Sequence, residues 1–218
     1  MGAKTNKQTM KKLVVIASLF MATMVTAQSK FESGMMKGLG MMKDAKSPQE
    51  LTDTEAFFER VADAEKTQWL PYYYAALAQA QYAFSVGADD KEKACAKAED
   101  LINKAEALEK NNSEIACVKA MIGTNRMLIN PQANYMSWMG SNKALMADAK
   151  KFDVTNPRPY FLEGQSVMGT PEQFGGGKAA AKPIFTKAVE LYKNFKPATP
   201  FNPTWGSDEA TKQLAACN

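Results

Sequence analysis

Apolar and small residues recur along this chain with the spacing of an amphipathic α-helix. Between residues 156 and 193, Tyr160 and Gly164 stand four positions apart. After three consecutive glycines, a second stripe follows with i, i+4, i+7 spacing: Ala181, Phe185 and Ala188. Residues at these spacings share one face of a helix. The pattern predicts two antiparallel helices that are joined by a turn and approach closely through small side chains.

The small residues of this pattern recur at a nearly fixed period. One series, with a spacing of 44 residues, consists of Ala76, Ala120 and Gly164. A second series, with spacings of 44 and 39, consists of Ala105, Ala149 and Ala188. Shared offsets of this kind indicate repeated helix pairs. We predict an all-α solenoid of about three antiparallel pairs, preceded by an N-terminal helix and closed by a C-terminal capping segment.

Residues 1–27 have the features of a secretory signal peptide. Four lysines and no acid precede the apolar run at residues 13–25, and the small residue Ala27 follows it. The run is shorter than the roughly 20 residues that a membrane-spanning helix needs. We therefore expect cleavage after Ala27, export to the periplasm or the medium, and no stable membrane insertion afterwards.

The rest of the chain divides into three segments. Residues 28–46 are rich in Met and Gly; thioethers can bind Cu(I), but with no His or Cys nearby we predict a short helix laid on the first repeat rather than a metal site. Residues 47–195 form the repeat domain, which begins at a capping box of Ser47 and Glu50. Residues 196–218 are a Pro-rich tail with a short helix, expected to cover the apolar end of the solenoid.

Composition excludes much catalytic chemistry. The chain has no His, so it lacks the commonest general base, the histidine-containing triads and most zinc sites. Four of the 27 basic residues and none of the 23 acidic residues lie in residues 1–27, which leaves 23 of each. This balance gives no reason to expect a nucleic-acid partner. We predict a protein that is not an enzyme and that uses no cofactor and no metal.

Residues 130–142 are the longest stretch without a helical pattern, and we interpret them as a loop. They carry Tyr135 and Trp138. Exposed aromatic side chains on a loop beside a rigid scaffold are typical of binding sites. The alternative is that both rings fold down and cover the repeat.

Residues 67–193 resemble tetratricopeptide (TPR) repeat proteins. Tyr160 and Gly164 match the aromatic and Gly positions of a repeat's first helix, and Ala181, Phe185 and Ala188 match the A-x3-F-x2-A pattern of its second helix. The copy at residues 156–177 is also similar to exported bacterial repeat proteins associated with solute uptake. The resemblance implies a concave groove, lined by the first helices, that holds a protein or peptide partner. Carried over to this chain, its expected apolar and aromatic lining includes Tyr73, Leu77, Met121, Arg158, Phe161 and Gln165.

Two functions are compatible with this pattern. The first is a non-catalytic exported scaffold that binds a protein or peptide through the groove, with Tyr135 and Trp138 as further contacts. The alternative is a carrier that holds a small apolar solute in a pocket between the helices. A groove open along its length would favour the scaffold, and a cavity of about 300–1,000 Å³ would favour the carrier.

Overall fold

The computed structural model describes residues 30–218, apart from the side chains at positions 89 and 90, and this part of the chain contains helices and no strand. A helix at residues 30–44 comes first. It is followed by α2 (Pro48–Ala64), α3 (Trp69–Ser85), α4 (Ala88–Leu108), α5 (Ser113–Met127), α6 (Pro131–Phe152), α7 (Arg158–Gly169), the 3-10 helix η1 (Glu172–Phe174), α8 (Lys178–Asn194) and α9 (Ser207–Ala216). The all-α prediction is confirmed. The predicted signal peptide lies outside the described residues.

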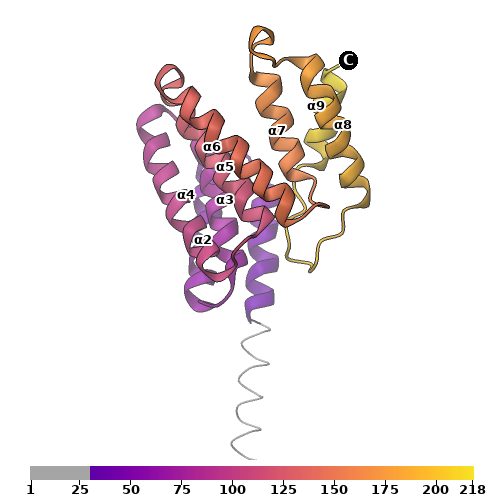
Figure 1. Ribbon diagram of the computed structural model, residues 1–218. Coiled ribbons are helices and arrows are strands. Elements are labelled where there is room, and N and C mark those ends of the chain that lie inside the picture. The colour runs from indigo at the N-terminus through magenta and orange to yellow at the C-terminus, as the bar shows by residue number, and fades with distance from the viewer. Residues whose placement is uncertain (1–29) are drawn as a thin grey trace, which may run out of the picture.

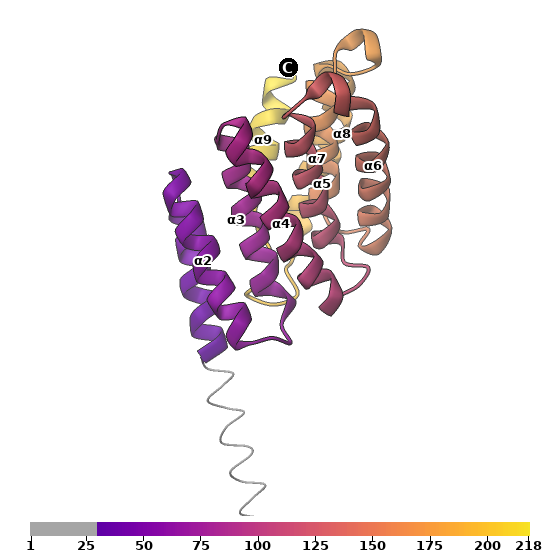
Figure 2. The same cartoon turned by 90° about the vertical axis from the view of Figure 1, so that its left-hand side faces the viewer.

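The helices stand side by side and form the pairs α3–α4, α5–α6 and α7–α8, with α2 before the first pair and α9 packed on α8 (Figures 1 and 2). The two series of small residues mark the contacts within this array. Ala76, Ala105, Ala149 and Ala188 are fully buried, and Ala120 is 2% exposed. The period of about 44 residues is therefore the repeat of the helix pairs. None of the helices within residues 30–218 has the length and apolar character that crossing a membrane requires.

Local sequence signals explain where several helices begin. The Ser47 hydroxyl accepts from the Glu50 N–H at 3.3 Å, while the Glu50 carboxylate accepts from the Ser47 N–H at 2.9 Å. This reciprocal pair satisfies two N–H groups that have no partner within α2. The Asn112 side chain caps α5 by accepting from the N–H groups of Glu114 and Ile115.

The predicted loop at residues 130–142 is wrong, because these residues form the first half of α6. Asn130 caps this helix by accepting from the Ala133 N–H, and Pro131 occupies the first helical position, where its missing N–H costs nothing. The same Asn-Pro pair that ends α5 therefore also begins α6. Polar residues and Gly140 in the first turns hide the helical period from the sequence.

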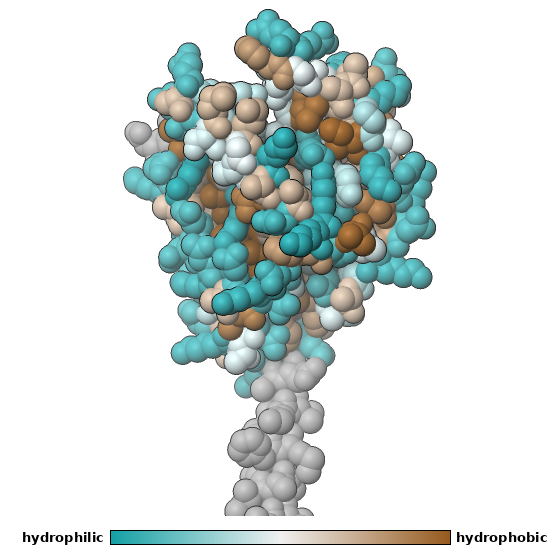
Figure 3. Space-filling view, viewed as in Figure 1, coloured by the Kyte–Doolittle hydropathy of each residue, from teal (hydrophilic) through white to brown (hydrophobic). Residues whose placement is uncertain are grey.

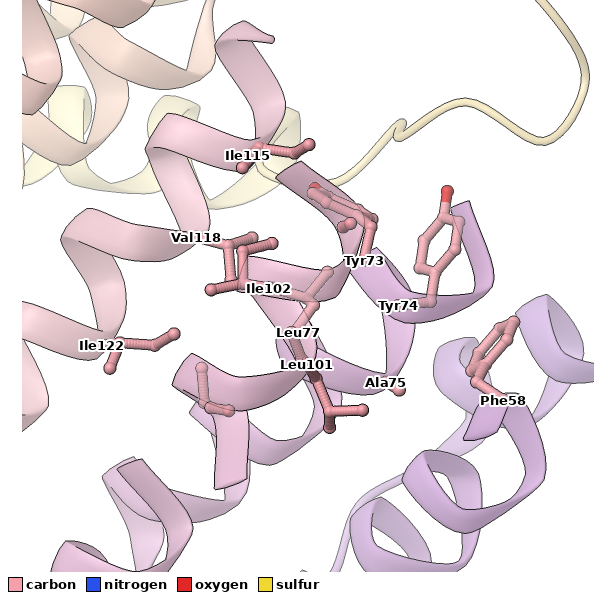
Figure 4. Close-up of a cluster of buried hydrophobic side chains, with 14 of the residues drawn as sticks. Phe58, Tyr73, Tyr74, Ala75, Leu77, Leu101, Ile102, Ile115, Val118 and Ile122 are labelled. Atoms are coloured by element: carbon pink, nitrogen blue, oxygen red, sulfur yellow. The ribbon is translucent and has the colours of Figure 1, made fainter. Parts of the chain in front are cut away.

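The larger hydrophobic core surrounds α3, which is apolar on nearly all sides and is therefore buried. Tyr73 and Leu77 of α3 are at most 1% exposed. They are packed among Leu101, Ile102, Ile115, Val118 and Ile122 of α4 and α5, and Tyr74 stacks on Phe58 of α2 (Figure 4). Met35 of the N-terminal helix is also fully buried in this core, as expected for methionines that fill gaps beside the first repeat.

A smaller core lies between α7, α8 and α9. Its buried members are Phe161, Ala181, Phe185, Ala188 and Ala210. A Cβ atom at Gly164 would lie 2.6 Å from the Phe185 ring, closer than real Cβ contacts come. Glycine at this position therefore allows α7 and α8 to approach closely, as the sequence pattern predicts.

Residues 195–206 form a strap between α8 and α9 that runs back to the first repeat. The Tyr74 hydroxyl donates to the Phe201 carbonyl oxygen at 2.8 Å, and the Trp205 indole N–H donates to the Tyr73 hydroxyl at 2.8 Å. The Tyr192 hydroxyl of α8 donates to the Trp205 carbonyl oxygen at 3.1 Å. The tail thus joins the two hydrophobic cores as well as covering α8.

Candidate functional site

A cavity of about 710 Å³ lies between the helices and is the candidate site. This volume falls in the range of small-molecule sites, about 300–1,000 Å³. Its lining comes from α3, α5, α6 and α7, with one residue from α9: Ala80, Gln81, Phe84, Ala120, Met121, Thr124, Asn125, Met127, Leu128, Tyr135, Trp138, Asn142, Leu162, Gln165, Ser166, Met168, Gly169, Thr170 and Gln213.

The lining is apolar with a few uncharged polar groups. Six of its residues carry aromatic rings or thioethers: Phe84, Tyr135, Trp138, Met121, Met127 and Met168. The polar groups are amides and hydroxyls, and none of the described residues in this lining is charged. Phe84 at the rim is 68% exposed. On the face seen in Figure 3, several hydrophobic side chains are exposed among the hydrophilic ones. Such a site suits a flat or bulky apolar ligand.

Hydrogen bonds fix the wall that α6 contributes. The Trp138 indole N–H donates to the Thr124 hydroxyl at 3.1 Å, and this hydroxyl donates to the Ala120 carbonyl oxygen at 2.9 Å. Asn142 Nδ2 also donates to Thr124 Oγ1, at 3.4 Å. Thr124 therefore holds the Trp138 ring in one orientation against the cavity, with the ring of Tyr135 5.7 Å away from it between centroids.

A second, smaller cavity of about 260 Å³ adjoins the first. Five residues line both cavities: Tyr135, Trp138, Asn142, Ser166 and Thr170. The smaller cavity also has two charged side chains, Lys143 and Glu163. Glu163 forms a salt bridge with Lys150. The two cavities therefore differ in character, since only the smaller one brings charge to the site among the described residues.

Four of the residues predicted from the sequence line the main cavity, namely Met121, Tyr135, Trp138 and Gln165. Tyr135 and Trp138 reach it from a helix rather than from a loop. Their role in binding remains a prediction.

The other four predicted residues lie in the interior and do not line the cavity. Tyr73, Leu77 and Phe161 are at most 4% exposed and belong to the two hydrophobic cores. Arg158 is 0% exposed. The TPR register places them on the groove face, but here Tyr73, Phe161 and Arg158 contact the strap, and Leu77 is buried in the core that α3 forms with α4 and α5.

Arg158 forms a buried polar cluster at the start of α7. Its Nη1 atom lies 2.8 Å from Glu114 Oε1 of α5, and its Nη2 atom donates to the Pro203 carbonyl oxygen of the strap. Glu114 also accepts from Asn156 Nδ2 at 2.8 Å and from the Tyr73 hydroxyl at 3.3 Å. Arg158 does bind a carboxylate, but the carboxylate belongs to this chain.

Burial and charge act against each other in this cluster. Burial raises the pKa of the Glu114 carboxyl, and the Arg158 guanidinium opposes that rise. Burial is the largest single influence on the pKa of Arg158 and would lower it, but the Glu114 carboxylate, together with smaller contributions from Tyr73, Tyr192 and Cys117, raises the pKa overall. The guanidinium also lies over the rings of Phe195 and Trp205, at 4.8 and 5.1 Å, where cation–π attraction favours the charged form.

Sequence reasoning missed several lining residues, among them Phe84, Asn142 and Gln213. Phe84 and Asn142 follow the helical spacing of known lining residues, because Phe84 lies four positions after Ala80 and Asn142 four after Trp138. That signal becomes usable once α6 is known to be a helix. Gln213 reaches the cavity from α9, far along the chain, and no local pattern indicates this.

The lining contains atoms that could coordinate a metal held inside a larger ligand. These are the sulfur atoms of Met121, Met127 and Met168 and the hydroxyl of Tyr135, since both thioether and phenolate groups coordinate iron in proteins. No cluster of His, Cys, Asp or Glu within residues 30–218 could hold a free metal ion.

Comparison with solved structures finds the HusA haemophore from Porphyromonas gingivalis, which superposes on this chain with a TM-score of 0.78. The two sequences are 33% identical, and the match covers 86% of this chain and 92% of the haemophore chain. No family model and no curated protein matches the sequence.

Proposed function

The chain belongs to the family of the HusA haemophore, and from this premise we propose that it is a carrier that binds haem or a related porphyrin in the main cavity. The cavity volume of about 710 Å³ and its apolar lining support this proposal. They favour the carrier over a scaffold for proteins or peptides, because four of the six residues expected to line an open groove, Tyr73, Leu77, Arg158 and Phe161, are instead buried.

The observation that carries the proposal is the composition of the cavity wall. A porphyrin is a flat apolar plate, and aromatic and thioether side chains provide polarisable contacts for its faces. The chain contains no His, so an imidazole cannot coordinate the iron. Iron coordination would fall to the Tyr135 hydroxyl or to the sulfur atoms of Met121, Met127 or Met168, all of which line the cavity.

A cavity-filling variant tests the site. Ser166 lines both cavities, so Ser166→Trp should occupy the space that the ligand needs. Ser141→Trp is a matched control, because Ser141 is exposed on α6 and lines neither cavity. Haem is titrated into each purified protein, and binding is followed by the Soret absorbance and by quenching of tryptophan fluorescence.

We expect saturable one-to-one binding by the wild type and by Ser141→Trp, and at least a tenfold weaker affinity for Ser166→Trp, with all three melting cooperatively. Undiminished binding by Ser166→Trp would place the ligand elsewhere. Absence of haem binding by the folded wild type would contradict the proposed function.

The remaining parts of the proposal concern export and ancestry. We propose that residues 1–27 are removed on export, a step that N-terminal sequencing of the mature protein would test. We also infer that the helix pairs are diverged tetratricopeptide repeats, on the basis of the buried small residues with the 44-residue spacing. Co-purification of a protein partner with the mature protein would instead support the scaffold.

A further inference from the structure

The smaller cavity holds a charge that the proposed haem site does not yet use. Among the described residues that line either cavity, Lys143 is the one cation. It lies on α6, one position after Asn142 of the shared wall, and its side chain is exposed. The salt bridges of residues 30–218 do not include it. Its ammonium group is therefore available to an anion that enters from the main cavity.

The other charge in this cavity does not compete strongly with such an anion. Glu163 lines the smaller cavity but forms a salt bridge with Lys150, whose ammonium group also lies 4.5 Å from the centre of the Tyr160 ring. Because Lys150 offsets the Glu163 carboxylate, the Lys143 charge is not cancelled within the lining.

The shared wall supplies a further polar group. Asn142 is 9% exposed and its Oδ1 atom has no hydrogen-bond partner among the described residues. A buried amide normally satisfies its hydrogen-bonding capacity. The free oxygen accepts from a ligand donor, and a half-turn of the amide, which gives up the long 3.4 Å bond to Thr124, presents the Nδ2 donor to a ligand carboxylate instead. An unsatisfied amide where the two cavities meet indicates that a polar part of the ligand passes this point.

We propose that the smaller cavity receives the carboxylate-bearing edge of the porphyrin, and that Lys143 makes the site selective for ligands whose carboxylates are free. This inference rests on the proposed function, and it gives the ligand an orientation. The plate lies among the aromatic and thioether side chains of the main cavity. Its acidic edge points past Asn142 toward Lys143.

The expected contribution is modest because Lys143 is exposed. Ion pairs of exposed groups contribute little, since water and salt screen them. Loss of the lysine charge should therefore weaken binding of a free acid by about two- to fivefold. An esterified ligand carries no charge at this edge and should not respond.

A comparison of an acid with its ester tests this orientation. Protoporphyrin IX and its dimethyl ester are titrated, in the same dilute detergent, into the wild type, Lys143→Met and Lys151→Met. Methionine keeps an unbranched side chain and removes the charge. Lys151 is a matched control, because it is exposed on the same helix and lines neither cavity.

We expect the wild type and Lys151→Met to prefer the acid over the ester, and Lys143→Met to lose this preference while its affinity for the ester is unchanged. Addition of salt should weaken acid binding to the wild type more than to Lys143→Met. Equal effects of Lys143→Met on acid and ester, or no effect on either, would overturn the proposed orientation and leave haem binding intact. If neither porphyrin binds the wild type, the proposed function itself fails.

Discussion

Helices α5 and α7 are neighbours, but their two ends meet in opposite ways. At their first turns, Glu114 of α5 and Arg158 of α7 form a buried ion pair without intervening space. At their last turns, Met121 and Thr124 of α5 face Gln165 and other residues of α7 across the main cavity. One end is closed by charge and the other is left open for a ligand.

The comparison indicates how an apolar cavity persists in a small helical protein. Apolar side chains around a void gain contacts if the helices close on it, so something must hold the helices apart. A buried ion pair has strict geometry, because both partners lose hydration and must satisfy each other. We infer that Glu114 and Arg158 fix the separation of α5 and α7 at one end. The pairing of each helix with α6 or α8 then maintains the space at the other.

Removal of the arginine should have the largest effect. Arg158→Ala leaves the Glu114 carboxylate buried without its charge partner, and breaking such a pair costs about 3–5 kcal/mol. The free energy of unfolding, measured by urea titration, should fall by this amount. The double variant Arg158→Met/Glu114→Gln removes both charges and should lose clearly less. Equal losses in the single and double variants would mean that the charge pair is not what closes this end.

Widening the contact between α7 and α8 should have the next largest effect. Because a Cβ atom at Gly164 would already meet the Phe185 ring at 2.6 Å, Gly164→Leu overpacks this contact and should cost about 1–3 kcal/mol. Gly140→Leu is the matched control, since a Cβ atom at Gly140 of α6 meets nothing within 4 Å. Thermal melts should show a lower Tm for Gly164→Leu only. An unchanged Tm would contradict the assignment of Gly164 to a tight contact.

Features that depend on local chemistry could be predicted from the sequence. The capping box at Ser47 and Glu50 gives the start of α2, and the buried series through Ala76, Ala120 and Gly164 gives the helix pairs. Each of these signals acts between residues close in sequence or at a constant offset. The 130–142 segment fails as a prediction because Asn130 and Pro131 fit both the end of one helix and the start of the next.

The site was only half predictable, for a different physical reason. Helical periodicity shows which residues share a face, but it does not show whether that face meets a neighbour or a void. Met121 and Gln165 fall on the void, whereas Tyr73 and Phe161, which the same register places one helical turn earlier in their helices, are buried. The difference comes from the strap, whose Trp205 contacts both cores from more than 40 residues away in sequence.

A second buried carboxylate sharpens the comparison, because its partner is a half-exposed lysine instead of a buried arginine. Glu55 of α2 is 1% exposed, and its carboxylate and that of Glu59 lie 2.9 and 3.1 Å from the Lys97 ammonium. Burial raises the pKa of Glu55 to about 7, and Lys97 only partly opposes this. The protonated form is therefore favoured in the folded state at acidic pH.

The sign of the pH dependence follows from this raised pKa. A carboxyl with a higher pKa in the folded than in the unfolded state stabilises the fold below about pH 4.5 and loses that contribution as pH rises through about 7. With screening at Lys97 taken into account, we expect a loss of about 1–2 kcal/mol between pH 5 and pH 8. Glu55→Gln should flatten this part of the profile. Urea titrations at several pH values that give parallel profiles for both proteins would contradict it.

At the open end, the smallest expected change comes from loss of the Thr124 hydroxyl, which accepts from both Trp138 and Asn142. The Thr124 hydroxyl accepts from the Trp138 indole at 3.1 Å and thereby orients the ring that walls the cavity. Thr124→Val removes the acceptor and leaves the buried indole N–H without a partner, which should cost about 1–2 kcal/mol of stability. Thr124→Ser keeps the hydroxyl and removes one methyl group, so it controls for packing.

Haem affinity, measured by fluorescence quenching, should fall a few-fold for Thr124→Val and remain near the wild-type value for Thr124→Ser, because only the valine variant frees the Trp138 ring. If both variants bind alike, contact area at the open end matters more than the orientation of this ring. The cavity would then depend on the closed end alone for its shape.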